Sequence, residues 1–320
     1  MRKHTATHIV ILAAGKGSRM KSSIPKVMHK LAGEPLLSHV LKATATISQA
    51  RKTVVVGQGG DSIVKHFENS PLARDIRFVN QTEQLGTAHA LKVATSDINE
   101  DSRVLVLFGD VPLIDPETIL RMLDLLESSD LVILTMEVLD PSGYGRILRD
   151  RDGKIEGIVE QKDATSYQEK ICEINTGVMA IDGSKLSHWL SQIRKNNVQG
   201  EYYLTDVVSL ARQDGDDIRS VSPNSVEEIE GVNNRLQLAR LERRYQLKLA
   251  EKLLLSGTSL ADPSRFDQRG ELIVGRDTFI DVNCVFEGSV ELGSGVLIGP
   301  NCQIKDTRIG DKAIILAKSG

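Results

Sequence analysis

Up to about residue 230, short apolar runs alternate with segments whose apolar residues recur at helical spacing. Because the runs are apolar on both faces, they resemble the strands of a buried parallel sheet. The pattern predicts strands at residues 8–14, 52–58, 76–80, 103–110 and 130–138. It predicts helices at residues 35–47, 62–69, 87–96 and 116–128. This alternation is typical of a doubly wound α/β sheet, whose ligands bind at the carboxyl ends of the strands.

A long amphipathic segment follows at residues 235–256. Its leucines and one tyrosine fall at spacings of three and four, and the opposite face is charged. We therefore expect one long helix. This helix could connect two domains, or it could be a further helix of the first domain. The two interpretations differ only in where the segment packs, and we expect the connecting helix.

From residue 271 the hydrophobic residues recur at every sixth position. A period of six fits neither a helix nor a plain strand, and it indicates a parallel β-helix of hexapeptide repeats with three hexapeptides per coil. Ile309 and Ile315 continue the pattern after a slip of one residue. Cys284 and Cys302 are 18 positions apart, so they should stack on adjacent coils as small apolar filling. The two series consist of Val274, Ile280, Phe286, Leu292, Ile298 and Ile304, and of Cys284, Val290, Val296 and Cys302.

The expected fold is thus an α/β, Rossmann-like domain with a mostly parallel sheet, then a connecting helix, then a short left-handed parallel β-helix. The predicted domains are residues 1–234, the helix 235–256 and the incomplete β-helix 257–320. Solenoids usually have several coils and a terminal cap, whereas this sequence has little more than two coils and no visible cap. We therefore expect the chain to be C-terminally shortened relative to a longer parent.

Composition narrows the class of partner. The chain has 320 residues, 40% of them hydrophobic, and a formal net charge of -3. Without a basic excess, neither nucleic acid nor an anionic membrane is expected as the main partner. Three cysteines without a C-x-x-C pair suit a reducing compartment and argue against a zinc site. No 18-residue apolar stretch or signal peptide is visible, so we expect a cytoplasmic protein.

The first candidate binding motif is ILAAGKGSRM, residues 11–20, a glycine-rich turn directly after a strand. It lacks the glycine spacing of a P-loop, and Met20 replaces the third glycine of a dinucleotide-binding fingerprint. Lys16, Arg19 and Lys26 lie within eleven residues of one another. Three cations beside a glycine turn favour a clamp for a triphosphate or pyrophosphate over a plain strand-to-helix turn.

Two more motifs follow predicted strands. In FVNQTEQLGTAHAL, residues 78–91, the amide of Gln81 could read a base edge, because an amide both donates and accepts. Gly86 would let a flat base lie on the backbone, and Thr87 would cap a helix. Asp110 ends an apolar strand in GDVPL, a position suited to Mg²⁺. Taken singly, these features also fit a capped helix and a turn.

Taken together, the motifs closely resemble those of the bacterial bifunctional N-acetylglucosamine-1-phosphate uridyltransferase/glucosamine-1-phosphate acetyltransferases, over essentially the whole chain. The sequence carries, in order, LAAGKGSRM, PKVMH, QLGTAHA, GDVPL, GYGRI, IVEQKD, EINTG, YYLTD, GVNNR and the hexapeptides. Two positions depart from the family pattern. Ala88 stands where the family usually has a second glycine, and Phe108 often corresponds to a tyrosine. Neither change removes a charge or a metal ligand, so activity is expected to survive.

The resemblance implies an enzyme that joins UTP to N-acetylglucosamine 1-phosphate. The products would be pyrophosphate and UDP-N-acetylglucosamine, a precursor of peptidoglycan and lipopolysaccharide. It also implies roles for individual residues: Arg19 and Lys26 on the phosphates, as the catalytic cations; Leu12, Ala13, Ala14 and Gly15 around the nucleotide; Gln81, Gly86 and Thr87 on the uridine; Gly145, Glu160, Asn175 and Asn233 on the sugar; and Asp110 and Asn233 on Mg²⁺.

The chemistry agrees with this set of residues. The attacking phosphate oxygen is already an anion at neutral pH, so no general base is required, and cations and positioning carry the catalysis. In the family, the acetyltransferase residues lie in later coils that this sequence lacks. We therefore expect no acetyltransferase activity from these residues. A homotrimer through the side faces of the β-helix is the expected assembly.

Two rival functions remain. A related pyrophosphorylase could use dTTP and glucose 1-phosphate, because uracil and thymine differ by one methyl group, which a pocket discriminates weakly. A non-catalytic assembly subunit is the other rival, but the phosphate and metal residues are all present. A simple hexapeptide acyltransferase does not fit, because the nucleotide motifs fill most of the chain.

Overall fold

The computed structural model describes residue 4 and residues 6–317. The chain forms two compact units. The first comprises residues up to Val27 and Leu37–Gly231, and the second comprises Met28–Leu36 and Val232 onward. The sequence did not predict that a short segment near the N-terminus would belong to the second unit.

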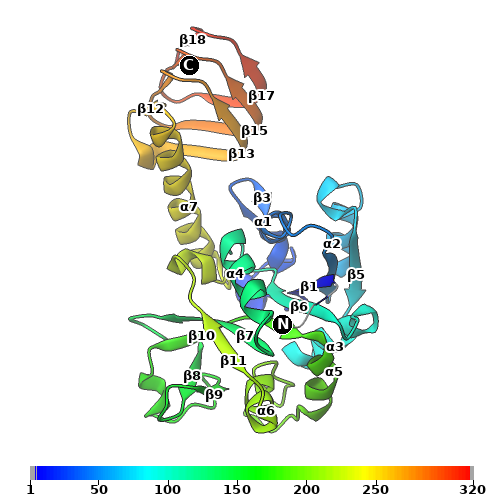
Figure 1. Ribbon diagram of the computed structural model, residues 1–320. Coiled ribbons are helices and arrows are strands. Elements are labelled where there is room, and N and C mark those ends of the chain that lie inside the picture. Colours follow the sequence, from blue (N-terminus) through cyan, green and yellow to red (C-terminus); the bar gives the residue numbers. More distant parts are fainter. Residues whose placement is uncertain (1–3, 5, 318–320) are drawn as a thin grey trace. The chain divides into compact units, whose positions relative to one another are not determined.

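The first unit is built on a nine-stranded sheet whose main path runs β11-β7-β10-β6-β1-β4-β5 (Figure 1). Strands β1, β4, β5 and β6 are mutually parallel, as predicted. Strand β10 is antiparallel to both β6 and β7, and β8 and β9 form an antiparallel extension. The strands are β1 (Ala6–Ala13), β4 (Arg51–Val56), β5 (Ile76–Asn80), β6 (Ser102–Phe108), β7 (Leu131–Glu137), β8 (Gly145–Arg149), β9 (Ile155–Val159), β10 (Glu173–Asp182) and β11 (Ile218–Val221).

Helices cover the sheet because its central strands are apolar on both faces. Val10 and Leu12 of β1 face one core cluster, to which α3, α5 and α6 contribute. Trp189 of α5 is fully buried in that cluster, and its indole Nε1 donates to Asp214. Helix α4 contacts β7 and β10. The helices are α1 (Leu36–Ala43), α2 (Gly60–Phe67), α3 (Thr87–Ala94), α4 (Pro116–Leu126), α5 (Gly183–Gln192) and α6 (Asp206–Asp214).

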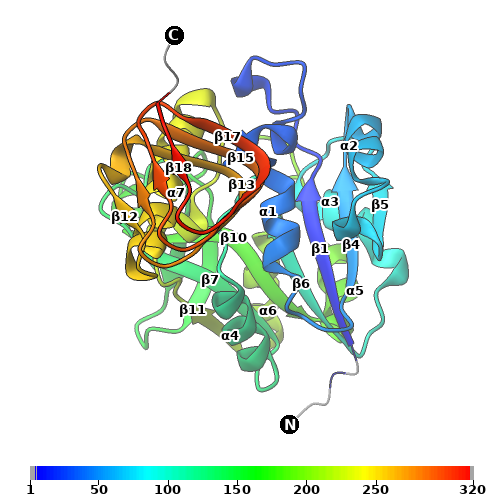
Figure 2. The same cartoon turned by 90° about the horizontal axis from the view of Figure 1, so that it is seen from above.

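The second unit contains a parallel β-helix, and Figure 2 looks along its stacked coils. Its predicted hydrophobic series meet in one core, where Cys284 and Cys302 are buried and unoxidised. The predicted one-residue slip is present, because pairing shifts from 18 to 17 residues between Glu287 and Val290. The strands are β12 (Ser259–Leu260), β13 (Phe266–Val274), β14 (Phe279–Ile280), β15 (Cys284–Leu292), β16 (Leu297–Ile298), β17 (Gln303–Ile309) and β18 (Ile314–Ile315).

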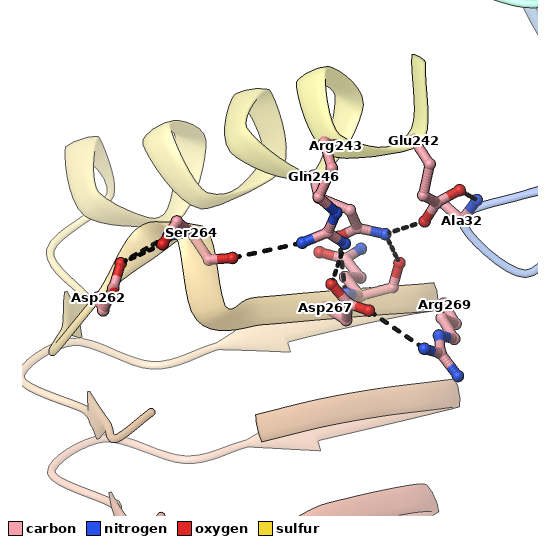
Figure 3. Close-up of polar contacts among 9 residues, drawn as sticks. Ala32, Glu242, Arg243, Gln246, Asp262, Ser264, Asp267 and Arg269 are labelled. Carbon is pink, nitrogen blue, oxygen red and sulfur yellow. Dashed lines mark hydrogen bonds and ion pairs between the residues drawn. The ribbon is translucent and has the colours of Figure 1, made fainter. Parts of the chain in front are cut away.

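Helix α7 (Arg235–Leu255) packs along strand β13, and polar contacts join the two (Figure 3). The buried amide of Gln246 donates to the carbonyl oxygen of Gln268 and accepts from its N–H, each at 2.8 Å. Gln246 also donates to Glu242, whose other carboxylate oxygen accepts from the N–H of Ala32. Ala32 lies between β2 (Lys30–Leu31) and β3 (Glu34–Pro35), so this relay ties the N-terminal hairpin to α7.

Candidate active site

A cavity of about 370 Å³ opens at the carboxyl ends of the central strands of the first unit. The glycine-rich turn that follows β1, the loop before α3 and the end of β6 all contribute to its wall. Most residues assigned to the nucleotide line it together. The lining comprises Leu12, Ala13, Ala14, Gly15, Lys16, Lys26, Val27, Gln81, Gln84, Gly86, Thr87, Ala90, Phe108, Asp110 and Glu201.

The cationic end of the cavity carries two of the three predicted phosphate-binding residues. Lys16 and Lys26 are both part of its wall. Arg19 is exposed in a single turn of 3-10 helix, Ser18–Met20, and is not among the lining residues. The buried side chain of Met20 anchors this turn, which explains why it replaces a glycine of the dinucleotide fingerprint.

Asp110 stands two residues beyond β6, where the sequence placed a metal ligand. The N–H of Gly109 donates to the carbonyl oxygen of Leu12 at 2.9 Å, so the loop after β6 extends alongside β1. The carboxylate of Asp110 pairs with the ammonium of Lys26, and both side chains are largely buried. Two residues to which the sequence gave separate roles are therefore direct partners.

Gln81 is held rigidly in the loop between β5 and α3. Its N–H donates to the carbonyl oxygen of Val56, and its side chain is only 3% exposed. The amide nitrogen contacts the carbonyl oxygen of Gly86 at 3.2 Å and Nδ1 of His89 at 3.0 Å. Because the protein uses the amide hydrogens, the carbonyl oxygen is the group of Gln81 that suits ligand recognition.

The prediction that Thr87 caps α3 is wrong. Gly86 occupies the N-cap position without a side-chain cap, and Thr87 is the first helical residue. The hydroxyl of Thr87 instead accepts from the N–H of Leu204 at 3.0 Å. The helix start is thus stabilised by a distant segment, which local sequence does not reveal.

That distant segment is the YYLTD motif, and it explains the glycine at position 86. The N–H of Tyr202 donates to Leu85, and its carbonyl oxygen accepts from Ala88. A Cβ at Gly86, whose φ is +114°, would lie 2.5 Å from the carbonyl oxygen of Tyr202. The glycine therefore makes room for the protein's own backbone, in addition to lining the cavity. Ala88 is buried in the core, so its extra methyl group is accommodated.

The three first-unit residues assigned to the sugar come together: Gly145 is on β8, Glu160 directly follows β9, and Asn175 is on β10. Gly145 is paired with Asn175 in the sheet, and a Cβ at Gly145 would lie 3.5 Å from Glu160 Oε2. Glu160 accepts a hydrogen bond from the hydroxyl of Thr205 at 3.1 Å. Burial raises the pKa of Glu160 above its ordinary value, and the Thr205 hydrogen bond opposes the shift. Asn175 is 6% exposed, and its Oδ1 accepts from the N–H of Gly177.

Asn233 belongs to the second unit, so its predicted pairing with Asp110 on a metal stays a prediction. Its N–H donates to the side chain of Gln237, and the neighbouring Asn234 caps α7 by accepting from the N–H of Gln237. Among the described residues, no group of three or more histidine, cysteine or acidic side chains is arranged to hold a metal.

Sequence reasoning missed Gln84 and Glu201 as cavity residues, and it used Phe108 only as a departure from a pattern. Phe108 packs against Gly177 of the EINTG motif, which joins the cavity wall to the neighbourhood of Asn175. The signal for Gln84 was its place between Gln81 and Gly86. Its partner lies 70 residues away, and sequence spacing cannot indicate that.

Comparison with known proteins identifies the family. Residues 9–150 match the MobA-like NTP transferase domain, and residues 272–306 match the bacterial transferase hexapeptide of six repeats. The chain is 49% identical over 312 residues to the bifunctional protein GlmU of Marinobacter nauticus, covering 98% of this chain and 68% of that protein. The chain belongs to the GlmU family.

A solved structure supports the fold of this GlmU family member. UDP-glucose pyrophosphorylase, crystallised with UDP-glucose, aligns with a TM-score of 0.60 at 17% identity, covering 76% of this chain and 100% of that one. At that identity the likeness concerns the fold. In the part of the chain that the structure describes, no helix has the length and hydrophobicity needed to cross a membrane.

Proposed function

We propose that the first unit transfers the uridylyl group of UTP to N-acetylglucosamine 1-phosphate, giving UDP-N-acetylglucosamine and pyrophosphate. One observation carries this proposal. The glycine-rich turn, two lysines, Asp110 and the buried amide of Gln81 line a single cavity at the carboxyl ends of parallel strands, where α/β sheets bind nucleotides. Membership of the GlmU family supports it.

Uracil fits the hydrogen-bonding state of Gln81. Its amide nitrogen is engaged by Gly86 and His89, so its carbonyl oxygen accepts from the ligand. The N3 atom of uracil carries a hydrogen and is a donor, whereas N3 of cytosine is an acceptor. Gln81 therefore favours uracil over cytosine, while the methyl group of thymine leaves this contact unchanged.

The acceptor sugar is assigned to the cluster of Gly145, Glu160 and Asn175. A carboxylate accepts from sugar hydroxyl groups, and an amide side chain pairs with the acetamido group, since each of them both donates and accepts. The cluster adjoins the nucleotide cavity through Phe108 and Gly177. This arrangement supports an N-acetylated sugar phosphate over glucose 1-phosphate.

The reaction needs alignment and charge neutralisation. A phosphate oxygen of the sugar phosphate attacks the α-phosphorus of UTP, and the bond from that phosphorus to the bridging oxygen breaks, so that pyrophosphate leaves. The attacking oxygen is already ionised and no proton has to be removed. Lys16 and Lys26 attract both polyanions, and Lys26 and Arg19 stabilise charge on the departing pyrophosphate.

The residues in the cavity wall suit Mg²⁺ that binds together with the nucleotide. Mg²⁺ sites that hold nucleotides use one or two carboxylates together with substrate phosphates, and Asp110 supplies one carboxylate in the cavity wall. Asp110 would hold the ion, and the second ligand that the resemblance implies, Asn233, stays a prediction because it belongs to the other unit. When bound, the metal ion would neutralise negative charge on the phosphates.

The deciding experiment is pyrophosphate release from UTP and N-acetylglucosamine 1-phosphate with Mg²⁺. Parallel reactions contain dTTP or glucose 1-phosphate in place of one substrate. Release with the first pair alone supports the proposal. A preference for dTTP or glucose 1-phosphate would change the assigned substrate, and no release with any pair would favour the non-catalytic subunit.

Two further assignments are proposals about these 320 residues. The hexapeptide coils support a homotrimer, which sedimentation equilibrium tests directly. The acetyltransferase reaction is expected to be absent. Release of coenzyme A thiol from acetyl-CoA that requires glucosamine 1-phosphate would contradict that expectation.

A further inference from the structure

The side chain of Gln84, which belongs to a distant segment of the chain, binds the main chain of the glycine-rich turn. Its Nε2 donates a hydrogen bond to the carbonyl oxygen of Ala14, and both residues line the cavity. Gln84 lies in the loop that also carries Gln81. One loop therefore supplies the residue assigned to the base and a residue that holds the turn at the phosphate end.

Gly57, directly after β4, leaves just enough room for this hydrogen bond. A Cβ at Gly57 would lie 2.5 Å from the carbonyl oxygen of Ala14 and 2.8 Å from Gln84 Nε2. Gly57 has no left-handed φ, so close approach, and not backbone strain, excludes a side chain here. Three segments from different strands thus meet at one carbonyl oxygen.

The hydrogen bond sets the direction of a whole peptide group. The Ala14–Gly15 peptide is trans, so the carbonyl of Ala14 and the N–H of Gly15 point in opposite directions. With the carbonyl oxygen fixed against Gln84 and Gly57, the N–H of Gly15 is directed away from them. Gly15 is exposed and lies beside Lys16 in the cavity wall. Main-chain N–H groups of such turns bind phosphate oxygens when cations stand nearby.

We propose that Gln84 is a positioning residue for UTP: seated against Gly57, its amide orients the Ala14–Gly15 peptide so that the N–H of Gly15 donates to the nucleotide phosphates. This inference rests on the proposed function, since it takes UTP as the ligand. It assigns Gln84 and Gly57 a role that depends on no direct contact with the substrate.

The test uses two substitutions that disturb the same hydrogen bond from opposite sides. Gln84→Met keeps size and neutrality but removes the donor, and Gly57→Ala pushes donor and acceptor apart. Glu83→Gln, at an exposed neighbouring position, is the matched control. Dissociation constants are measured by calorimetry for UTP and for uridine, which lacks phosphates, and thermal melting verifies that each variant is folded.

Both variants should bind UTP about tenfold more weakly, the value of one hydrogen bond to a charged group, while uridine affinity stays within about twofold. In turnover, KM for UTP should rise more than kcat falls. The double variant should bind UTP with the same affinity as the single variant that binds it less tightly, because both changes break the same interaction. The control should match the parent.

Equal losses for UTP and uridine, or unchanged UTP affinity in both variants, would overturn the inference. Additive losses in the double variant would also contradict it. The binding readout separates this inference from the proposed function. A parent protein that binds UTP but releases no pyrophosphate would refute the reaction and leave the positioning role standing, whereas a parent that does not bind UTP would refute both.

Discussion

The ammonium of Lys26 pairs with the carboxylate of Asp110, and the two side chains are only 15% and 16% exposed. Asp110 therefore cannot turn its carboxylate fully to a metal ion without weakening its contact with Lys26. If Lys26 binds phosphates and Asp110 binds a metal ion, as we propose, the phosphates of an incoming nucleotide would offer Lys26 a replacement partner. Phosphate binding by Lys26 would then free the carboxylate of Asp110 for the metal ion.

Removing the carboxylate should disable the reaction. We expect Asp110→Ala to lower kcat about 100- to 1,000-fold, as does the loss of other preorganised electrostatic contacts in active sites. Pyrophosphate release at saturating Mg²⁺ and substrates measures the effect. Asp124→Ala, at an exposed site on α4, should retain parental turnover. Turnover of Asp110→Ala within about tenfold of the parent would remove Asp110 from the mechanism.

Base selection should follow the hydrogen bonds of Gln81. Because its amide nitrogen is engaged by Gly86 and His89, we expect CTP to be used at least about 100-fold less efficiently than UTP, as expected when buried polar groups lose their partner. Comparison of kcat/KM for the two nucleotides tests this. Comparable values would show that Gln81 does not read N3 of the base.

Gly86 should tolerate no side chain. Gly86→Ala would place a Cβ 2.5 Å from the carbonyl oxygen of Tyr202, at a φ that already disfavours other residues. Gly153 is a matched control, because its φ is also positive but no atom lies within 4 Å of the added Cβ. We expect Gly153→Ala to cost about 1 kcal/mol of unfolding free energy and Gly86→Ala clearly more, with impaired UTP binding. Equal losses of unfolding free energy in Gly86→Ala and Gly153→Ala, measured by urea unfolding, would contradict the packing argument.

The parts of the fold that depend on local patterns could be predicted from sequence. The parallel strands around β1 and the hexapeptide core follow from apolar periodicity, which the structure confirms. The antiparallel placement of β10 could not be predicted, since strand direction depends on how β10 returns to β6. The hairpin around Ala32 was missed because its partner, Glu242, is 210 residues away.

The candidate site divides in the same way. The resemblance to a family assigned residues that the structure places in one cavity, including Lys26, Asp110 and Gln81. The local residue pattern, and not the resemblance, gave Thr87 a capping role; the N-cap is Gly86, and the Thr87 hydroxyl accepts from the N–H of Leu204. Contacts between distant segments decide such details, and they leave no periodic trace in the sequence.

Histidine at position 8 should make the stability of the first unit depend on pH. Burial, aided by Arg51 and Arg77, lowers the pKa of His8 from 6.5 to about 4, and its Nε2 contacts Thr53 Oγ1 at 2.9 Å. The unfolded chain therefore binds more protons than the folded one between these two values. Stability from this group is complete above pH 6.5 and decreases as the pH falls towards 4.

Urea unfolding at pH 7.5 and pH 5.0 tests this dependence. The parent should lose stability at the lower pH, and His8→Gln, which can still contact Thr53, should lose less. His66→Gln changes an exposed histidine and should behave like the parent. An identical pH dependence in His8→Gln and the parent would show that His8 does not cause it.

In the second unit, the amide of Gln246 should stabilise strand β13 of the β-helix. It pairs with both main-chain groups of Gln268 and is 1% exposed (Figure 3). Gln246→Leu keeps the volume but leaves a buried donor and acceptor unpaired, at a cost of about 1–3 kcal/mol each. Gln268→Ala retains those main-chain contacts and should cost far less.

Hydrogen exchange of peptides from β13 reports on this region separately from the first unit. Faster exchange there in Gln246→Leu alone is expected, and equal exchange in both variants would show that the edge of the β-helix is stabilised by apolar packing instead.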